Sequence, residues 1–557
     1  MLQGLPLLAV TFSLVYVLRL LLNWWNGVRS IGNMPGYRTL FSQYGMVARI
    51  LPRLTFINPG GNHFFEDKHS SFKAAGWDMV SVVSALPSTM ITVNIADADT
   101  AQEVIASRAH FPKPIKQYRA LTFFGHNIVA SEDEEWKKYR KITAPAFSDR
   151  NNKLVWDETV KIVQGLFADV WHDKDVITVD HAVDITLPVA FLSAFLYTKS
   201  AYSVQIALFV IGVAGFGRDM SWRDDDLVPP GHLMTFKDSL HIASLDVFFK
   251  VFLPDWALVR LGQRTKNVKT AFDELEKYMK EMIHDRQTSE KVERYDLFSS
   301  LLAANNDDLE SVRLADSELI GNIFIFLVAG HETTAHTLCF TFALLALYPD
   351  EQEKLFQQIK SLLPEDRLPT YEEMPLYKYS MAVFYETLRL FPPVVNIPKV
   401  SAEDTVLTVG NAFGEKKTFP IPKDTRVSIN VPGLHYNPRY WDEPEAFKPE
   451  RFLKPDWPRD AFIPFSAGEF LIDFCALHFV THSSTLLGVR SCLGRKFFET
   501  EGIAVLTLLV SKFKITIKDE PEFAGETFEQ RKERVLRNTN RLTLTPTRVP
   551  LTFTRRV

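Results

Sequence analysis

A run of polar residues, HETTAH at positions 331–336, interrupts an otherwise apolar segment of the chain. A zinc-protease helix carries histidines at i and i+4, so that both imidazoles lie on one helix face. Here the histidines are His331 and His336, at i and i+5. At about 100° per residue, this spacing places them about 140° apart around the helix. One metal ion cannot easily be bound by both rings, and the spacing therefore argues against a zinc protease.

The same run offers an acid and a hydroxyl for proton transfer. Ala329, Gly330, Glu332 and Thr333 lie inside a segment, 316–348, that is apolar enough to be a core helix. Glycine destabilises a helix interior by about 1 kcal/mol, a buried carboxylate is costly unless paired, and threonine can bond an upstream carbonyl and bend a helix. Such locally unfavourable residues indicate a functional kink with a proton path. A polar seam between packed helices is the alternative.

Cys492 has the surroundings of a thiolate. Arg490 stands two residues before it and a helical segment begins after Gly494, so positive charge and N–H donors would lie near the sulfur. Cys339 and Cys475 are the other two cysteines, and three are too few for a disulfide framework. A thiolate in such a place can be a ligand of haem iron. The alternative is that each cysteine is a small buried apolar residue.

Further short motifs are weak signals when taken singly. Glu386 and Arg389, in ETLR, stand at i and i+3 and can pair on one helix face. Arg451 lies in FKPERF at 447–452, and Trp136 and Arg140 lie in EWKKYR. Phe465 opens FSAG at 465–468.

Taken together and in this order, these motifs resemble the cytochrome P450 family, from about residue 34 to the C-terminus. AGHETT resembles the oxygen-activating helix motif, ETLR the E-x-x-R motif, and RSCLG the end of the cysteine loop. The resemblance is to membrane-bound, eukaryotic, fungal-type members. It implies a mainly α fold with small peripheral β-sheets (α+β), with haem between a long central helix and the cysteine loop.

The resemblance also implies roles for individual residues. Cys492 would be the axial thiolate of haem b, Thr333 would steady dioxygen, and Glu332 would relay protons beside Gly330 and Ala329. The residues implied around the haem are Arg490, Trp136, Arg140, Phe465 and Gly494. The remaining implied residues are an ion network, Glu386, Arg389 and Arg451, and an apolar substrate pocket, Phe123, Phe124, Val394, Val395 and Ile397.

The activity that the resemblance implies is a monooxygenase. It would insert one oxygen atom from O2 into a hydrophobic organic substrate, by hydroxylation or epoxidation, in secondary or lipid metabolism. Electrons would come from NADPH through a separate NADPH-cytochrome P450 reductase, with cytochrome b5 as a candidate second donor, since the chain has no flavin or nicotinamide fingerprint. A reductase-independent haem-thiolate isomerase or dehydratase is one alternative, which the intact Glu332 and Thr333 disfavour. A haem-deficient, inactive product is another.

The chain departs from the family pattern beside the cysteine. In the family a phenylalanine stands seven residues before the cysteine, whereas Phe465 is separated from Cys492 by an additional segment, 469–488. Removing this largely apolar segment restores FSAGVRSCLG. Its end codons can carry GT and AG, so one hypothesis is a retained intron, and a second candidate is 189–205. A genuine insert is the other interpretation, because loop length itself costs little free energy.

Hydrophobic periodicity predicts the elements that must hold these residues. Helices are expected at 266–285, 316–348, 350–363 and 371–390, and strands at 89–95, 404–410, 418–430 and 541–556. Polar residues within 316–348 argue against a second membrane span there. No stretch after residue 34 has the composition of an interdomain linker, so 34–557 is expected to form one catalytic domain.

Residues 1–33 are expected to form a transmembrane anchor and a linker. The apolar run 5–25 is long enough to cross a bilayer, and the first arginine, Arg19, lies late in it. The positive-inside rule then places the catalytic domain in the cytosol, as a single-pass protein of the endoplasmic reticulum membrane. A cleaved signal peptide is the alternative, but the run lacks a basic start. The net charge of −4 and the absence of a long basic tract argue against a nucleic-acid partner.

Overall fold

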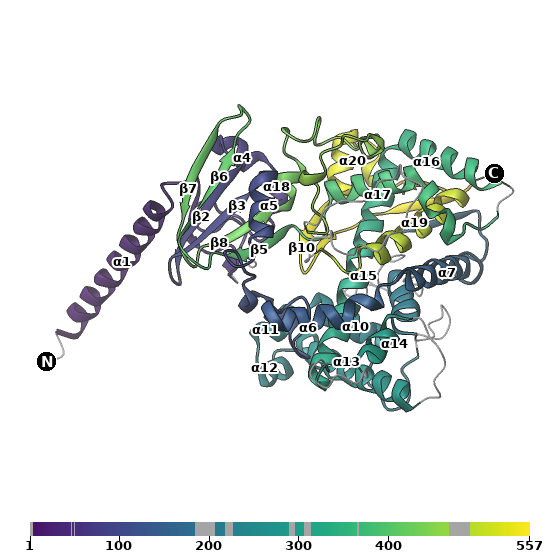
Figure 1. Ribbon diagram of the computed structural model, residues 1–557, viewed down its shortest axis with the longest axis horizontal. Helices are drawn as coiled ribbons and strands as arrows, with labels where there is room; N and C mark the ends of the chain where they lie inside the picture. The colour runs from purple at the N-terminus through teal and green to yellow at the C-terminus, as the bar shows by residue number, and fades with distance from the viewer. Residues whose placement is uncertain are drawn as a thin grey trace. The chain divides into compact units, whose positions relative to one another are not determined.

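The computed structural model describes residues 4–45, 47–48, 51–183, 206–217, 227–288, 296–305, 313–364, 367–466 and 491–556. The contacts of these residues group the chain into two compact units (Figure 1). Unit 1 comprises Met1–Pro114, Val394–Ala446 and Asp456–Ser491. Unit 2 comprises Ile115–Pro393, Phe447–Pro455 and Cys492–Val557. The stretch expected to form one catalytic domain therefore contains both units.

Unit 1 is built on a five-stranded sheet of order β1-β2-β3-β8-β5, with a separate β6-β7 hairpin. Strands β2 and β3 pair antiparallel, while β1 pairs parallel with β2 and β8 parallel with β3. The strands of unit 1 are β1 (Gly36–Phe41), β2 (Met79–Leu86), β3 (Met90–Ile95), β5 (Asn396–Val400), β6 (Thr405–Gly410), β7 (Lys416–Ile421) and β8 (Arg426–Asn430). Its helices are α1 (Gly4–Ser30), α3 (His63–Asp67), α4 (Ser70–Ala75), α5 (Ala98–Ala106), α18 (Val431–His435) and the 3-10 turn η9 (Arg459–Ala461).

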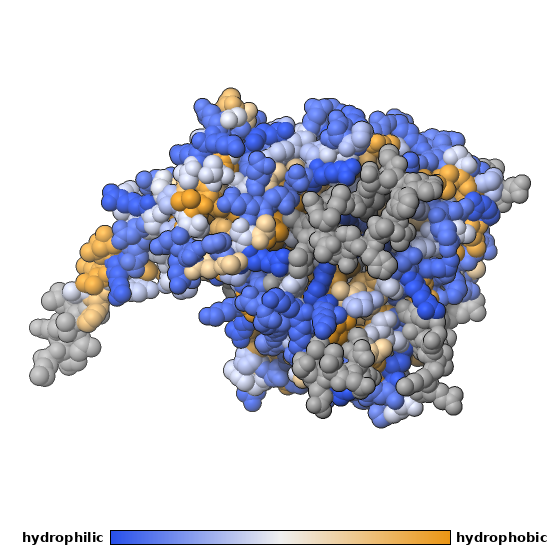
Figure 2. Space-filling model, viewed as in Figure 1, coloured by the Kyte–Doolittle hydropathy of each residue, from blue (hydrophilic) through white to orange (hydrophobic). Residues whose placement is uncertain are grey.

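Helix α1 exposes apolar side chains instead of burying them. Phe12 is 73% exposed and Leu14 65% exposed, and hydrophobic residues gather along this helix in Figure 2. Its C-terminal end lies on the sheet, where the Trp24 indole N–H donates to the Val83 carbonyl at 3.1 Å. A helix with an apolar surface of this kind needs a cover that the described residues do not supply.

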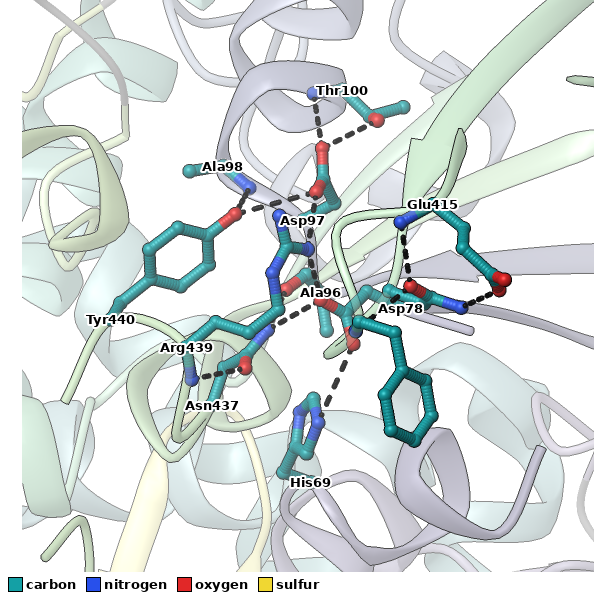
Figure 3. A network of polar contacts seen from close by, with 12 residues as sticks. His69, Asp78, Ala96, Asp97, Ala98, Thr100, Glu415, Asn437, Arg439 and Tyr440 are labelled. Atoms are coloured by element: carbon teal, nitrogen blue, oxygen red, sulfur yellow. Dashed lines mark hydrogen bonds and ion pairs between the residues drawn. The ribbon is translucent and has the colours of Figure 1, made fainter. Parts of the chain in front are cut away.

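A polar network joins distant segments of unit 1 (Figure 3). The Arg439 guanidinium contacts Asp78 at 2.5 Å and Asp97 at 2.9 Å. The Asn437 amide donates to Asp78 at 2.8 Å, and the His69 ring nitrogen Nε2 lies 3.5 Å from the same carboxylate. Both aspartates are buried, and each has the hydrogen-bond partners that a buried carboxylate requires.

Unit 2 is mainly helical. Its helices are α6 (Asp133–Thr143), α7 (Asp149–Gly165), α9 (Ile206–Val210), α10 (Phe236–Leu245), α11 (Val247–Phe252), α12 (Asp255–Arg260), α13 (Gln263–Thr288), α14 (Leu297–Asn305), α15 (Asp316–Leu347), α16 (Pro349–Leu362), α17 (Lys378–Leu390), α19 (Arg495–Lys512) and α20 (Phe528–Val535). Its shorter 3-10 and π turns are η1 (Ile115–Leu121), η2 (Ala144–Ala146), η3 (Leu166–Val170), η4 (Ile211–Gly215), η7 (Tyr371–Leu376), η8 (Pro449–Leu453) and η10 (Pro521–Phe523).

Two small sheets complete unit 2. Strand β12 (Leu551–Arg555) pairs antiparallel with both β4 (Val176–Val179) and β9 (Phe513–Ile517). Strand β10 (Asn538–Asn540) pairs with β11 (Leu544–Pro546) in a short hairpin. The prediction of a mainly α fold with small β-sheets is confirmed.

Helix α15 is the core of unit 2. It packs against α10, α13, α17 and α19, among others, and most of its side chains are buried. Among the described residues it is the helix long and apolar enough to cross a membrane, but it is enclosed by protein. The sequence prediction of a buried core helix agrees with this position.

Two predicted boundaries were wrong. The helix expected over 371–390 is broken into η7 and α17, because Pro375 cannot donate a backbone hydrogen bond and disrupts the regular helix. The strand expected over 541–556 is divided into β11 and β12, where Pro546 is the last residue of β11 and Pro550 directly precedes β12. A turn at 422–425 separates β7 and β8 within the stretch 418–430, and the other predicted elements correspond to α13, α15, α16, β3 and β6.

Candidate active site

The start of α15 is fixed by an acidic first turn. The Glu318 carboxylate accepts the Ala315 backbone N–H at 2.7 Å, which satisfies one of the free donors of the first turn. The same carboxylate contacts the Lys138 ammonium at 2.7 Å and accepts the Tyr139 hydroxyl at 2.8 Å. Lys138 and Tyr139 belong to α6, so this contact fixes α6 against the start of the long helix.

One face of α15 is open, although the helix is otherwise buried. Ala329 is exposed, and Gly330 and Thr333 are half-buried, whereas their neighbours are buried. Ala329 and Thr333 stand at i and i+4 and therefore lie on the same face. The Thr333 hydroxyl donates to the Ala329 carbonyl at 2.9 Å, and the Thr334 hydroxyl donates to the Gly330 carbonyl at 3.0 Å. These bonds orient both hydroxyls within the AGHETT motif, where the family resemblance predicts that dioxygen is bound.

Gly330 also has a packing role. A Cβ at this position would lie 2.9 Å from the Ile211 Cδ1 atom and 3.1 Å from its Cγ1 atom. Ile211 is a buried residue of η4. The glycine thus allows η4 to approach the middle of α15 closely.

Glu332 lies on the buried side of α15 and is 2% exposed. Burial raises the pKa of this carboxyl to about 7, although the Thr543 hydroxyl, 3.4 Å away, and the charge of Arg541 both act to lower it. An acid with a pKa near neutrality can both hold and release a proton at physiological pH. The role of Glu332 as a proton relay stays a prediction, which this raised pKa and the buried position support.

The two histidines of HETTAH have separate partners. The His331 Nδ1 atom bonds the Leu327 carbonyl at 2.6 Å. The His336 Nδ1 atom bonds the Thr543 hydroxyl at 2.8 Å. Both rings are buried. Their different partners agree with the large angle between them that the sequence predicted.

Cys492 lies just before α19, and Gly494 caps that helix. The side chain is accessible, yet burial raises the pKa of its thiol. The Gly494 N–H bonds the sulfur, and the charges of Arg495 and Arg140 favour its ionised form. These donors and charges are what a thiolate ligand of a metal requires.

Trp136 and Arg140 stand one helical turn apart on α6. Burial lowers the pKa of the Arg140 guanidinium, and the charge of Cys492 acts in the opposite direction, because the two groups lie near each other. Trp136 is 5% exposed. The structure thus brings the W-x-x-x-R motif and the cysteine, more than 350 residues apart in sequence, to one region of unit 2.

Glu386, Arg389 and Arg451 form one buried network. The Arg389 guanidinium binds Glu386 through two nitrogens, at 2.7 and 2.8 Å. Arg451 reaches the same carboxylate at 3.3 Å, and the Lys448 backbone N–H donates to it at 2.9 Å. Glu386 and Arg389 are 0% exposed. The network connects α17 to η8 and so fixes the segment carrying PERF.

A second set of polar contacts, beside the cysteine, was missed from sequence. The Arg495 guanidinium binds Glu499 at 2.7 Å and the Tyr385 hydroxyl at 3.0 Å, and Tyr385 donates to Glu499 at 2.7 Å. Nearby on the same helix, Glu501 is buried with neither carboxyl oxygen hydrogen-bonded among the described residues. The sequence could have indicated these contacts, because Glu499 and Glu501 stand among the many apolar residues of α19.

The residues predicted to line a substrate pocket fall in different units. Phe123 and Phe124 belong to unit 2, where both rings pack on Phe272 of α13 and Phe124 also packs on Phe324 of α15. They form an apolar wall next to the core helix. In unit 1, Val394 is 45% exposed, Val395 is buried, and Ile397 pairs with Ile429 in the sheet. That these residues line one pocket stays a prediction.

Several predictions concern the cysteine loop and the inserts. Arg490, 189–205 and 469–488 lie outside the described residues. Phe465 is half-buried in a turn of unit 1, and its role beside the haem stays a prediction. Arg541 and Thr543, in contrast, were not predicted and lie next to Glu332, because the loop between β10 and β11 carries them there.

Comparison with known proteins agrees with this arrangement. Residues 69–469 match the family model described as Cytochrome P450. The match ends where the sequence departs from the cysteine-loop pattern, before Cys492. The chain is 50% identical to cytochrome P450 monooxygenase 124 of Postia placenta over 557 residues, covering 100% of both chains. It is 28% identical to cytochrome P450 monooxygenase ORF6 of Penicillium roqueforti over 76% of this chain and 73% of that one.

A solved structure, the haem domain of cytochrome P450DA, has a similar fold. The TM-score is 0.69 at 21% identity, over 94% of this chain and 98% of the other. The matched family residues include α15, Glu386, Arg389 and Arg451, and the relative from Postia placenta matches along the whole chain. The chain belongs to the cytochrome P450 family and is a haem-dependent monooxygenase.

Proposed function

We propose that this protein inserts one oxygen atom from O2 into a hydrophobic organic substrate, with haem b held by Cys492. The observation that carries the proposal is the setting of Cys492: an accessible sulfur before α19, bonded by the Gly494 N–H and close to Arg140. Haem with an axial thiolate supplies the oxygen-activating chemistry when it is bound. Residues of α6, of α15 and of the cysteine loop would hold the haem and control its surroundings.

Side chains of α6 and of α15 fit haem, which is planar, largely apolar and anionic at its propionates. Trp136 and Arg140 on α6 offer an indole N–H and a guanidinium for the propionates, as would Arg490. Ala329 leaves room on the open face of α15 that a larger side chain would fill, and Gly330 lets η4 approach the helix beside it. Phe465 and Gly494 would shape the cysteine loop.

Glu332 and Thr333 would supply protons on the oxygen side. The Thr333 hydroxyl lies on the open face of α15, while the Glu332 carboxyl, with a pKa of about 7, lies on the buried side. Proton delivery of this kind is needed for monooxygenation and less so for isomerisation or dehydration. The arrangement thus favours a monooxygenase over a reductase-independent enzyme.

The substrate would be apolar, because Phe123 and Phe124 present an aromatic wall beside α15. Electrons would come from NADPH through a separate reductase. The exposed apolar surface of α1 supports a membrane anchor at 1–33, with the catalytic part on the cytosolic side of the endoplasmic reticulum. A place in secondary or lipid metabolism is part of the same proposal.

The test is the carbon monoxide difference spectrum of the reduced, full-length protein. Cys492→Ser should abolish the thiolate-type band and turnover with a reductase, while Cys475→Ser and Cys339→Ser, the matched controls, should keep both. A thiolate-type band that survives in Cys492→Ser would refute the proposal.

A variant that lacks 469–488 separates the two interpretations of the insert. If this segment is a retained intron that prevents haem binding, its removal should raise the haem content of the purified protein severalfold. Equal haem content with and without the segment would favour a genuine insert.

A further inference from the structure

Glu332 is the inner end of a hydrogen-bonded line that the sequence did not reveal. The Thr543 hydroxyl lies 3.4 Å from the Glu332 Oε2 atom, and the His336 Nδ1 atom lies 2.8 Å from the same hydroxyl. Glu332 is 2%, His336 1% and Thr543 5% exposed. Three polar side chains from two distant segments therefore meet in a buried place.

The direction of donation follows from the proton count. A threonine hydroxyl has one hydrogen to donate. When Thr543 donates it to Glu332, it must accept from His336, so the His336 ring carries its hydrogen on Nδ1. The Nε2 atom is then an acceptor, and it is buried with no hydrogen-bond partner among the described residues. A buried ring nitrogen of this kind can accept a hydrogen bond from a water molecule.

The surroundings keep His336 neutral. Burial, together with the charges of His331, His181, Arg541 and His241, lowers the pKa of His336 to about 3. These groups come from α15 itself, from the segment after β4, from the β10–β11 loop and from α10. The carboxyl at the end of the line is Glu332. A neutral imidazole does not store charge, but it can accept a proton on one nitrogen as it releases one from the other.

We propose that His336 resupplies Glu332 with protons through Thr543. When Glu332 has given up its proton on the oxygen side, its carboxylate takes the Thr543 hydrogen, and Thr543 takes the Nδ1 hydrogen of His336. Nε2 takes a proton from a hydronium ion that solvent delivers through water, which leaves a neutral water molecule. One proton moves inward and no group is oxidised or reduced. The ring returns to its Nδ1–H form when Nε2 gives a proton to water and Nδ1 takes one from it. The inference rests on the proton role proposed for Glu332.

The 3.4 Å separation between Thr543 and Glu332 is long for an O–H···O bond. Catalytic hydrogen bonds are often long before substrate binds and shorten afterwards.

The test follows the infrared C=O band of protonated Glu332, identified by its loss in Glu332→Gln. The infrared measurement needs no bound haem, so it tests the role of His336 and Thr543 even if the proposed cofactor chemistry is wrong. The carbon monoxide spectrum of Cys492→Ser tests that chemistry separately. Thr543→Val should raise the carboxyl pKa above the wild-type value of about 7, because a bond that lowers it is removed. Thr543→Ser should restore the wild-type value, and Thr545→Val is the matched control.

His336 is tested by the rate at which the band appears after a rapid drop in pH. In His336→Asn the amide can still donate to Thr543, but it cannot transfer protons by changing tautomer. The carboxyl pKa should therefore stay near the wild-type value while its protonation slows about 100-fold. A wild-type rate in His336→Asn, or an unchanged pKa in Thr543→Val, would overturn the proposal.

Discussion

The Glu386 network of unit 2 and the Arg439 network of unit 1 are built oppositely. In unit 2, the single carboxylate of Glu386 is shared by the guanidiniums of Arg389 and Arg451. In unit 1, the single guanidinium of Arg439 is shared by the carboxylates of Asp78 and Asp97 (Figure 3). The first has an excess of positive charge and the second an excess of negative charge.

The two networks also differ in how they respond to solvent and pH. Arg389 is 0% exposed, while the Arg439 side chain is 26% exposed. Burial acts to raise the pKa of Asp97, but the Thr100 N–H and hydroxyl and the Arg439 guanidinium outweigh it, so that this pKa lies below its ordinary value of 3.8. A carboxylate can be neutralised by acid, whereas a guanidinium stays charged. If Arg439 is lost, the aspartates of the unit 1 network can become neutral by taking up protons. If Glu386 is lost, the two guanidiniums of the unit 2 network stay charged.

The largest effect is expected from Glu386→Gln. It leaves two guanidiniums, one of them fully buried, without their shared carboxylate. Urea unfolding should show a loss of about 3–5 kcal/mol, as for other broken buried ion pairs. Glu372→Gln, which removes an exposed partner of Lys153, is the control. A loss below about 1 kcal/mol for Glu386→Gln would contradict the assigned role of this network.

Arg439→Met should cost about 2 kcal/mol at pH 7, because Asp78 and Asp97 retain the Asn437 and Thr100 donors. The sign of the pH dependence follows from the lowered pKa of Asp97. Its contribution to stability is present above pH 3.8 and is lost as the pH falls through the folded-state value. The difference between wild type and variant in the free energy of unfolding should therefore shrink at pH 3. A constant difference would show that Asp97 is not the responsive group.

Glu501→Met should stabilise the protein by about 1 kcal/mol, since it replaces a buried acid that has no hydrogen-bond partner among the described residues with an apolar side chain. Burial raises the pKa of Glu501 well above 4.5. A raised pKa contributes stability that is complete below pH 4.5 and is lost as the pH rises through the folded-state value. Thermal unfolding from pH 5 to 9 should thus show the variant gaining over wild type with rising pH. A variant less stable at every pH would mean that Glu501 has a partner in the folded protein.

The smallest effect is expected from Glu450→Gln, next to Arg451. Glu450 pairs with Lys354 at 2.7 Å, but it is 59% exposed. Exposed pairs contribute about 0.5 kcal/mol or less. Urea unfolding should find Glu450→Gln nearly neutral, although its neighbour Arg451 belongs to the buried network. A loss comparable to that of Glu386→Gln would remove the distinction between exposed and buried pairs.

The unit 2 network could be predicted from sequence, and the unit 1 network could not. Glu386 and Arg389 are three residues apart, so helix geometry alone brings them together. Asp78 directly precedes β2, Asp97 caps the start of α5 and Arg439 follows α18, so no local periodicity relates them. The two threonines near Glu332 differ in the same way. Thr333 could be predicted from its motif, whereas Thr543 is brought to Glu332 only by the β10–β11 hairpin.

The sequence by itself determined the long apolar helix, the acid and hydroxyl within it, the i, i+3 ion pair and the cysteine before a helix. Each depends on backbone hydrogen bonds or side-chain spacing within a few residues, which the chain specifies locally. Only the tertiary structure decided that Arg140 lies near Cys492, that Thr543 and His336 extend from Glu332, and that Arg439 joins two aspartates. These contacts depend on which apolar faces pack together, and packing free energy is summed over the whole unit and not encoded at any one position.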